Sequence, residues 1–301
     1  MATNLFLMLI LLSHVASSLS EGCHPHDKKA LLQIKKELNN PTLLSSWKPH
    51  TDCCNSNWHG VNCIPSNRVY YLTIEIDDDL ASLFPPSIGN LPYLDSLFIY
   101  QLPNLTGTIP QSIIKLTNLR SLTIRATTIS GPIPNFIAKM KSLTHLDLSD
   151  NHLSGTLPPN LYQLPNLEAI ILENNKLTGP IPISLARLNS LDVDLSHNRL
   201  EGDASMFFGL TKHTETINLS WNMFSFDMGK LELPESLRLL GVSHNRVYGK
   251  LPDGVKNLQW LNVSYNRLCG EIPKVGYFST FPVSSFVHNK CLCGSPLPSC
   301  K

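Results

Sequence analysis

The sequence repeats a pattern of about 24 residues, and this repeat constrains the fold more than any other feature. The segment LDLSDNHLSGTLPPNL, residues 146–161, is followed 24 residues later by IILENNKLTGPIPISL, residues 170–185. An asparagine recurs at the same place in six successive segments: Asn151, Asn175, Asn198, Asn222, Asn245 and Asn266. A fixed period of this length is typical of a solenoid, in which stacked coils bury apolar residues that a single coil would expose. With poorer copies upstream, we count about nine units over residues 68–273.

Each unit reads as a short strand followed by a turn. Because side chains alternate along a strand, Leu146 and Leu148 should point into the core and Asp147 toward solvent. Asn151 stands where the strand ends, and its amide should bond backbone groups that the sheet leaves unpaired. The Leu-x-x-Leu-x-Leu-x-x-Asn-x-Leu spacing resembles that of leucine-rich repeats. We therefore predict an α/β solenoid: a curved, right-handed leucine-rich-repeat superhelix with a parallel sheet on its concave face.

The two ends of the chain indicate a secreted protein. Residues 1–20 contain a short apolar run followed by small residues, which is typical of a signal peptide and too short for a membrane span. In an oxidising compartment, cysteines near the ends predict disulfide-linked caps, which we assign to residues 21–67 and 274–301. Sequence order alone leaves the connectivity open. The eight cysteines are Cys23, Cys53, Cys54, Cys63, Cys269, Cys291, Cys293 and Cys300.

The N-terminal cap should contain a helix. We expect Asp27 to be its N-cap residue, and the helix should end before Pro41. Its apolar stripe, which should pack into the core, consists of Ala30, Leu31, Ile34 and Leu38.

The outward-facing positions of the predicted sheet form a surface suited to a protein partner. Acidic residues are concentrated in the middle units, and aromatic residues lie toward both ends. Exposed aromatic side chains on a rigid scaffold are good anchors, and a patch of one charge selects a partner of the opposite charge. The alternative is a solvated sheet that binds nothing. The candidate partner-binding residues are Tyr100, Arg125, His145, Asp147, Ser149, Asp150, Ile171, Glu173, Asp194, Ser196, His197, Ser220, Trp221, His244 and Tyr265.

Cations recur just after the repeat asparagine, at Lys176, Arg199, Arg246 and Arg267. Stacking would align them into a ridge beside the acidic face, which would suit a linear polyanion such as an acidic polysaccharide. Lys and Arg are also common solvating residues, so chance alignment is the competing interpretation.

Three sequons of the form Asn-x-Ser/Thr predict glycosylation at Asn104, Asn218 and Asn262. Asn218 and Asn262 fall at outward strand positions, so a glycan on either would crowd the predicted face.

Several function classes are disfavoured by the sequence. A formal net charge of +1 provides no electrostatic case for nucleic acid or an anionic membrane. Asp192 and Asp194 lie on one side of a strand, like the carboxylates of a glycosidase, but an open sheet has no pocket in which to raise one pKa. The Cys291-x-Cys293 spacing does not suit a common zinc finger. We expect no catalytic residue, no metal and no cofactor.

The chain closely resembles the polygalacturonase-inhibiting proteins of plants. The resemblance rests on LSGTLPP and LTGPIPISL, on the segment DCCNSNWHGVNC, on LEGDASMFFG in the middle of the chain, and on NRLCGEIP and CLCGSPLPSC near the end. It implies a monomer in the cell wall that binds fungal, and in some cases insect, endopolygalacturonases by its concave face and blocks their access to pectin. It further implies the pairs Cys23–Cys53, Cys54–Cys63, Cys269–Cys291 and Cys293–Cys300. It also implies binding of pectin, or homogalacturonan, at Lys176, Arg199 and Arg246.

The chain departs from this family in one respect, and two other functions compete. The family has ten repeats, whereas we count nine, with a unit missing near residues 181–198. Because one unit fewer shifts all later side chains by about 4.8 Å relative to earlier ones, inhibition of any given enzyme is in question.

The first competing function is an interaction module in receptor or developmental signalling. The second is ice binding, which requires a flat, regular array of Thr, Ser or Asn.

Overall fold

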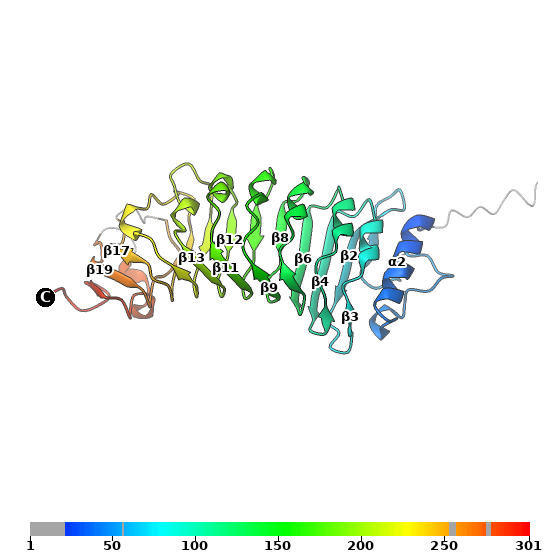
Figure 1. Ribbon diagram of the computed structural model, residues 1–301, viewed down its shortest axis with the longest axis horizontal. Coiled ribbons are helices and arrows are strands. Elements are labelled where there is room, and N and C mark those ends of the chain that lie inside the picture. Colours follow the sequence, from blue (N-terminus) through cyan, green and yellow to red (C-terminus); the bar gives the residue numbers. More distant parts are fainter. Residues whose placement is uncertain (1–21, 56, 253–256, 275–277) are drawn as a thin grey trace, which may run out of the picture.

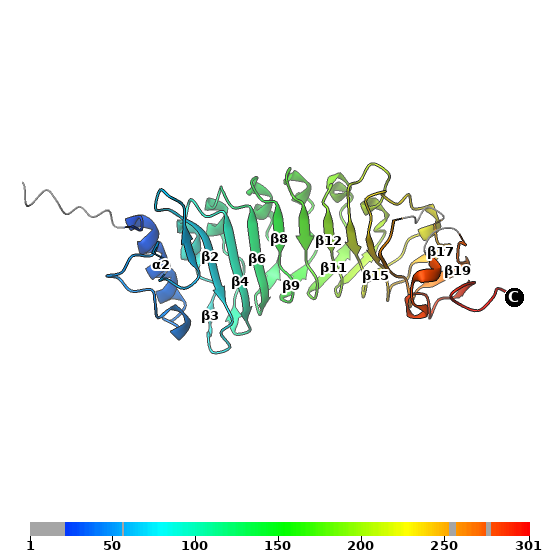
Figure 2. The same cartoon turned by 180° about the vertical axis from the view of Figure 1, so that it is seen from behind.

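The computed structural model describes residues 22–301 apart from 56, 253–256 and 275–277. The predicted signal peptide lies outside these residues. The protein is an elongated stack of coils with α2 (Pro25–Glu37) at one end and the C-terminus at the other (Figures 1 and 2). In the described part of the chain, no helix is both long enough and apolar enough to cross a membrane.

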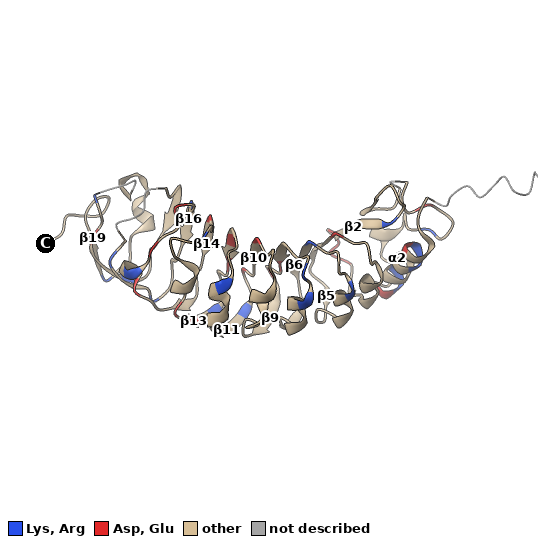
Figure 3. Ribbon diagram, turned by 90° about the horizontal axis from the view of Figure 1, so that it is seen from above, with Lys and Arg blue, Asp and Glu red and all other residues tan. Residues whose placement is uncertain are grey.

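The main element is a ten-stranded sheet that lines the concave side of the curved stack (Figure 3). Its first strand is antiparallel to the second, and each later neighbour is parallel. This confirms the predicted leucine-rich-repeat solenoid. In sheet order the strands are β1 (Val61–Cys63), β2 (Val69–Glu75), β4 (Ser96–Leu102), β6 (Ser121–Thr127), β8 (His145–Asp147), β10 (Ala169–Ile171), β12 (Asp192–Asp194), β14 (Thr216–Asn218), β16 (Leu239–Gly241) and β18 (Trp260–Asn262).

Short strands on the opposite side of each coil form three smaller sheets (Figure 3). The five-stranded one consists of β7 (Ser130–Pro132), β9 (His152–Gly155), β11 (Lys176–Pro180), β13 (Arg199–Gly202) and β15 (Met223–Phe224). The others pair β3 (Ser82–Leu83) with β5 (Leu105–Thr106), and join β17 (Tyr248–Gly249), β19 (Arg267–Glu271) and β20 (Cys291–Cys293).

One-turn 3-10 helices complete most coils, and six of them are preceded by proline. They are η1 (Thr42–Leu44), η2 (Pro86–Asn90), η3 (Gln111–Lys115), η4 (Asn135–Lys139), η5 (Leu161–Gln163), η6 (Ile183–Arg187), η7 (Ser205–Phe207), η8 (Met228–Lys230), η9 (Phe278–Thr280) and η10 (Val283–Ser285).

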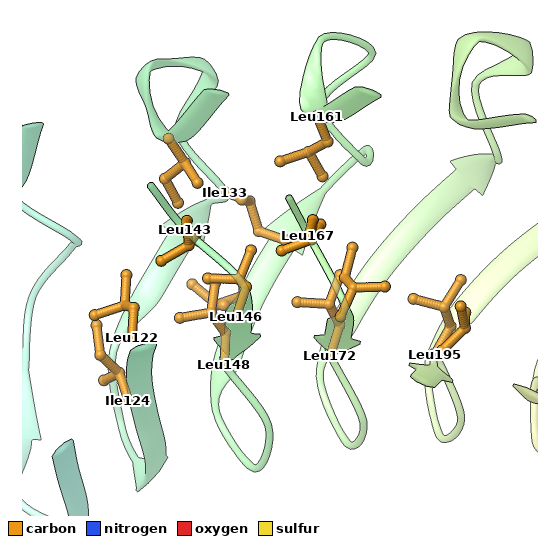
Figure 4. Close-up of a cluster of buried hydrophobic side chains, with 14 of the residues drawn as sticks. Leu122, Ile124, Ile133, Leu143, Leu146, Leu148, Leu161, Leu167, Leu172 and Leu195 are labelled. Carbon is orange, nitrogen blue, oxygen red and sulfur yellow. The ribbon is translucent and has the colours of Figure 1, made fainter. Parts of the chain in front are cut away.

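The core is a set of apolar ladders that run along the stack (Figure 4). In one ladder, Leu122, Leu146 and Ile170 occupy the same register on neighbouring strands and are 2% exposed or less. A second ladder runs through Ile124, Leu148, Leu172 and Leu195, which are all fully buried. Each such side chain contributes about 1.5–3 kcal/mol when fully covered, and that cover comes from the neighbouring coils.

The repeat asparagines form a hydrogen-bonded ladder at the end of the strands. The Asn175 amide nitrogen donates to the carbonyl oxygens of Leu148, Leu172 and Glu173, and its oxygen accepts from the Leu153 amide at 2.9 Å. The amide nitrogens of the other repeat asparagines donate to the same three carbonyl positions. Their oxygens accept from a backbone amide of the preceding coil, except that of Asn151, which accepts from the Thr127 hydroxyl. Each side chain therefore joins its own coil to the preceding one, which confirms the backbone-pairing role predicted from sequence.

The cap disulfides are Cys23–Cys53, Cys54–Cys63, Cys269–Cys291 and Cys293–Cys300, the pairs that the family resemblance implies. The apolar stripe of α2 is buried in the core, as expected.

The prediction that Asp27 caps α2 is wrong. His24 is the N-cap residue, while Asp27 lies inside the first turn with its side chain fully buried. Its carboxylate accepts two hydrogen bonds from the Arg68 guanidinium, at 2.8 and 2.9 Å, and a third from the Val69 amide. Burial alone would raise the pKa of Asp27, but the bonds from Arg68 and Val69 outweigh it and lower the pKa. The ion pair joins the cap helix to the first parallel strand.

Candidate functional site

A residue with a left-handed backbone ends the concave strand in each coil. Asp150, His197, Trp221, His244 and Tyr265 all have φ between 53° and 58°, and each immediately precedes the repeat asparagine. This conformation is uncommon for residues other than glycine, and it also occurs at the equivalent residues Ile76, Gln101 and Ala126, which no asparagine follows, so it is a property of the coil itself. The side chains of this position therefore lie in one column along the edge of the concave face.

Toward the C-terminus this column is a continuous stack of rings, which we call the ring ladder: His197, Trp221, His244, Tyr265 and His288. The successive ring centroids are 5.4, 3.6, 4.1 and 4.1 Å apart, and the planes are within 23° of parallel. Sequence reasoning proposed four of these residues as separate contacts and missed both the stacking and His288. The signal was present, because an aromatic residue precedes the asparagine in each of these coils and VHNK in the cap repeats the frame.

An acidic cluster, consisting of Asp150, Glu173 and Asp194, lies beside the start of the ring ladder. Burial raises the pKa of Glu173, and the negative charges of Asp194 and Asp150 raise it further. Figure 3 shows acidic segments on the concave side around β10 to β14. The cluster is smaller in net charge than the sequence suggested, because Arg125 forms an ion pair with Asp150 at 3.1 Å.

Three predicted contact residues are not on the surface. Ser149, Ser196 and Ser220 are 1%, 0% and 6% exposed, so their assignment to the partner-binding face is wrong. The error came from extending the strand alternation too far, since β8, β12 and β14 already end two residues earlier. The Ser149 hydroxyl donates to Asp147 at 2.6 Å and the Ser196 hydroxyl donates to Asp194 at 2.6 Å, which fixes both carboxylates at the strand ends.

The remaining predicted contact residues are at least partly exposed. Tyr100 and Arg125 are neighbours on β4 and β6, and Ile171 and Asp194 follow Asp147 in one register across β8, β10 and β12. His145 is exposed on β8, with its ring nitrogen 4.0 Å from the Glu168 carboxylate.

The predicted basic residues Lys176, Arg199 and Arg246 are exposed at the turn beyond the asparagine ladder. Lys176 and Arg199 are the first residues of β11 and β13. Within the described residues, none of the three forms an ion pair, so their charges face solvent.

Two of the three sequons lie on the concave sheet. Asn218 is half-buried on β14 and donates to Asp194 at 3.0 Å, and Asn262 is half-buried on β18. A glycan on Asn218 would stand beside the acidic cluster. Asn104 is exposed outside the concave strands, in the loop before β5.

The fold and this face define a leucine-rich repeat protein. The family model of the leucine-rich repeat N-terminal domain matches residues 24–64, and leucine-rich repeat models match residues 117–177 and 257–275. The chain is 50% identical to a polygalacturonase inhibitor of Vitis vinifera, over 98% of this chain and 96% of that protein. A polygalacturonase inhibitor of Pyrus communis is also 50% identical, over 100% and 98% of the two chains. The chain belongs to the polygalacturonase inhibitor family.

Two further relatives carry other names. The leucine-rich repeat protein FLOR 1 of Arabidopsis thaliana is 52% identical over 93% of this chain and 94% of its own. The crystal structure of a plant ice-binding protein is 42% identical with a TM-score of 0.80, and covers 93% of this chain and 98% of that chain.

The alignment with the Vitis vinifera protein spans 323 positions, whereas this chain has 301 residues. The difference, 323 − 301 = 22, leaves at least 22 positions without a counterpart here. That number is close to the 24-residue period of the repeat.

Proposed function

We propose that this protein inhibits endopolygalacturonases by covering their substrate cleft with its concave face. The observation that carries the proposal is 50% identity to polygalacturonase inhibitors along the whole chain, in a fold that presents an acidic cluster on a rigid concave sheet. The same assignment makes the protein a non-catalytic one, secreted to the cell wall.

Charge complementarity explains how this face would select its partner. An enzyme that binds the polyanion pectin needs a basic cleft, and an acidic surface steers toward such a cleft. Glu173 and Asp194 supply negative charge that Arg125 does not neutralise, and Asp150 supplies less because of its ion pair. The ring ladder, with Trp221 and Tyr265 49% and 44% exposed, provides apolar anchoring area at the edge.

The number of coils determines which polygalacturonases the concave face can cover. The acidic cluster and the C-terminal end of the ring ladder are held at a fixed separation by the stacked strands, about 4.8 Å per coil. One coil fewer than the relatives changes this separation, so we expect inhibition of a narrower set of enzymes than the ten-coil relatives inhibit.

The exposed cations Lys176, Arg199 and Arg246 support a second, weaker interaction with pectin itself. They occupy the same place after the repeat asparagine in their coils and face solvent, so an enzyme and a pectin chain would contact neighbouring surfaces. Binding to homogalacturonan should therefore weaken with added salt.

The direct test is to assay fungal and insect endopolygalacturonases with and without the purified secreted protein. We expect at least one enzyme to be inhibited, with an inhibition constant that rises with ionic strength because the contact is electrostatic. Inhibition of none, at low salt and across the panel, would contradict the proposal and favour an interaction module of receptor or developmental signalling.

One observation favours ice binding as a second candidate. The ice-binding relative shares the whole fold, and the small sheets opposite the concave face carry one hydroxyl per coil at Thr106, Ser130, Ser154 and Thr178. This row was missed from sequence, where only the concave columns were considered. Glu201 interrupts it in the next coil, which shortens the regular array.

We expect the interrupted row to produce no thermal hysteresis beyond that of a protein control at equal concentration. A Glu201→Thr variant extends the row by one coil and is the matched comparison. Hysteresis in the unmodified protein, enhanced by Glu201→Thr, would establish ice binding instead.

A further inference from the structure

The ring ladder alternates imidazoles with other aromatic rings, and nothing in its role as an anchor requires this. Three imidazoles, His197, His244 and His288, are separated by Trp221 and Tyr265. Histidine is the side chain that changes charge between pH 5 and 8, so a ladder of this composition changes its own charge in that range.

Protonation of the central imidazole is disfavoured by its surroundings. The pKa of His244 is lowered by burial and, further, by the positive charge that His197 and His288 acquire. Its Nδ1 atom is buried and has no hydrogen-bond partner among the described residues, so a proton there would be unpaired. The rings of Trp221 and Tyr265 cover its two faces, at 3.6 and 4.1 Å.

The charged groups around the ring ladder do not reverse the lowering of the pKa of His244. At its N-terminal end, His197 acts on the pKa of Glu173, which lies next to Asp194. Beyond the asparagine ladder, Arg199, Arg246, Arg267 and Lys290 follow the ring residues at two positions along the chain and are all exposed. The charges that act on the pKa of His244 are those of His197 and His288.

Protonation of the acidic cluster and protonation of the ring ladder both make the concave face more positive. As the pH falls, Glu173 takes up its proton earlier than an ordinary glutamate, because its pKa is raised. Histidine side chains in general change charge between pH 5 and 8, so protonation along the ladder adds positive charge. The concave face therefore loses negative charge at the acidic cluster and gains positive charge along the ladder.

We propose that the ring ladder makes binding of a basic protein partner dependent on pH: the neutral ladder supports the contact, and the protonated ladder repels the partner. The inference rests on the proposed function, since it takes a polygalacturonase with a basic cleft as that partner. Because the partner binds the unprotonated ladder, affinity falls as the pH falls from 7 to 5.

The test uses a variant that keeps the rings and removes their titration: His197→Phe, His244→Phe and His288→Phe together. The matched control changes three exposed histidines outside the ladder: His50→Phe, His59→Phe and His213→Phe. Inhibition constants are measured at pH 7 and pH 5 against one polygalacturonase that the unmodified protein inhibits. Comparing variants against the same enzyme at each pH cancels the pH dependence of the enzyme.

We expect the unmodified protein and the control to weaken on the order of tenfold between pH 7 and pH 5, because interface charges change association rates by 10- to 1000-fold. The ring variant should lose most of that dependence. Equal pH dependence in all three proteins would overturn the inference while leaving the proposed function intact.

A measurement on the protein alone tests the ring ladder separately from the inhibition of polygalacturonases. Histidine ring resonances, assigned by the single His→Phe variants, should show that the pKa of His244 lies below the ordinary histidine range. If His244 titrates together with the exposed histidines, the ladder does not hold it neutral and the inference fails. If no polygalacturonase is inhibited at either pH, the proposed function fails, and the pH-dependent contact with such an enzyme fails with it.

Discussion

Replacing Asp27 with alanine is expected to lower the free energy of unfolding by about 3–5 kcal/mol, because it leaves a buried partner of an ion pair uncompensated. Arg68 is only 13% exposed and loses both of its hydrogen bonds to the carboxylate, and the Val69 amide loses its acceptor. For a protein of this size, we expect a fall in melting temperature on the order of 10 °C. Thermal unfolding followed by calorimetry measures it.

The matched control is Lys29→Ala, an exposed residue on the same helix, which should change the melting temperature little. The melting temperature of Asp27→Asn should lie between those of Asp27→Ala and Lys29→Ala. The asparagine amide can still accept a hydrogen bond from the Val69 amide, but it carries no charge to pair with Arg68. A melting temperature of Asp27→Ala within 2 °C of the control would show that the cap is not held by this pair.

The pH dependence of this contribution follows from the direction of the shift. The pKa of Asp27 is lower in the folded protein than its ordinary value of 3.8, so ionisation favours folding. The stabilisation is complete above that ordinary value and is lost as the pH falls through the lower folded value. The difference in stability between the unmodified protein and Asp27→Asn should therefore shrink only at strongly acidic pH.

The second large effect is expected on inhibition, from neutralising the concave face. The variant Asp150→Asn, Glu173→Gln, Asp192→Asn removes three negative charges from the face and should slow association by about 10- to 100-fold at low salt, since steering acts on the rate of association. The difference in association rate between the variant and the unmodified protein should become smaller at high salt, because dissolved ions screen the attraction. Association rates by surface plasmon resonance at two ionic strengths measure it.

The three substitutions are chosen to leave the fold unchanged. Asn174 already occupies the position of Asp150 in the next coil, with the same left-handed backbone, so asparagine is accepted there. Asp147→Asn and Asp194→Asn are avoided because each would create an Asn-Leu-Ser sequon.

Stability provides an internal check on this variant. The raised pKa of Glu173 means that its ionised form is disfavoured in the folded protein, so Glu173→Gln should not lower stability at pH 7.

A control that removes three negative charges away from the concave face is Glu201→Gln, Glu232→Gln, Glu235→Gln, and it should associate at a nearly unchanged rate. Equal slowing in both variants would point to net charge rather than to this face.

The sequence by itself determined the architecture. The 24-residue period, the alternating leucines and the repeat asparagines are local patterns with one physical solution, because only stacking buries the leucines and pairs the backbone. The same patterns located the concave face, and the position of Asp147 and Asp194 on it followed from strand alternation.

The local irregularities were decided only in three dimensions. In the coil that follows β11, one residue fewer precedes the strand, so that Ser190 takes the buried leucine position at 2% exposure and Leu191 is 39% exposed. The Ser190 hydroxyl is satisfied by the Leu167 carbonyl at 2.9 Å. Residue type alone predicts the opposite, because neighbouring coils rather than local hydrophobicity decide which side chain faces inward.

The functional surface also depended on contacts that no single segment contains. The burial of Ser149 and Ser196 follows from strands that end earlier than their alternating pattern suggests, and the pair Asp27–Arg68 joins residues 41 positions apart. The ring ladder consists of residues 21 to 24 positions apart, which stack because the left-handed backbone recurs at the same point of successive coils. Sequence therefore specified the coils, whereas the alignment of one coil on the next decided which side chains meet.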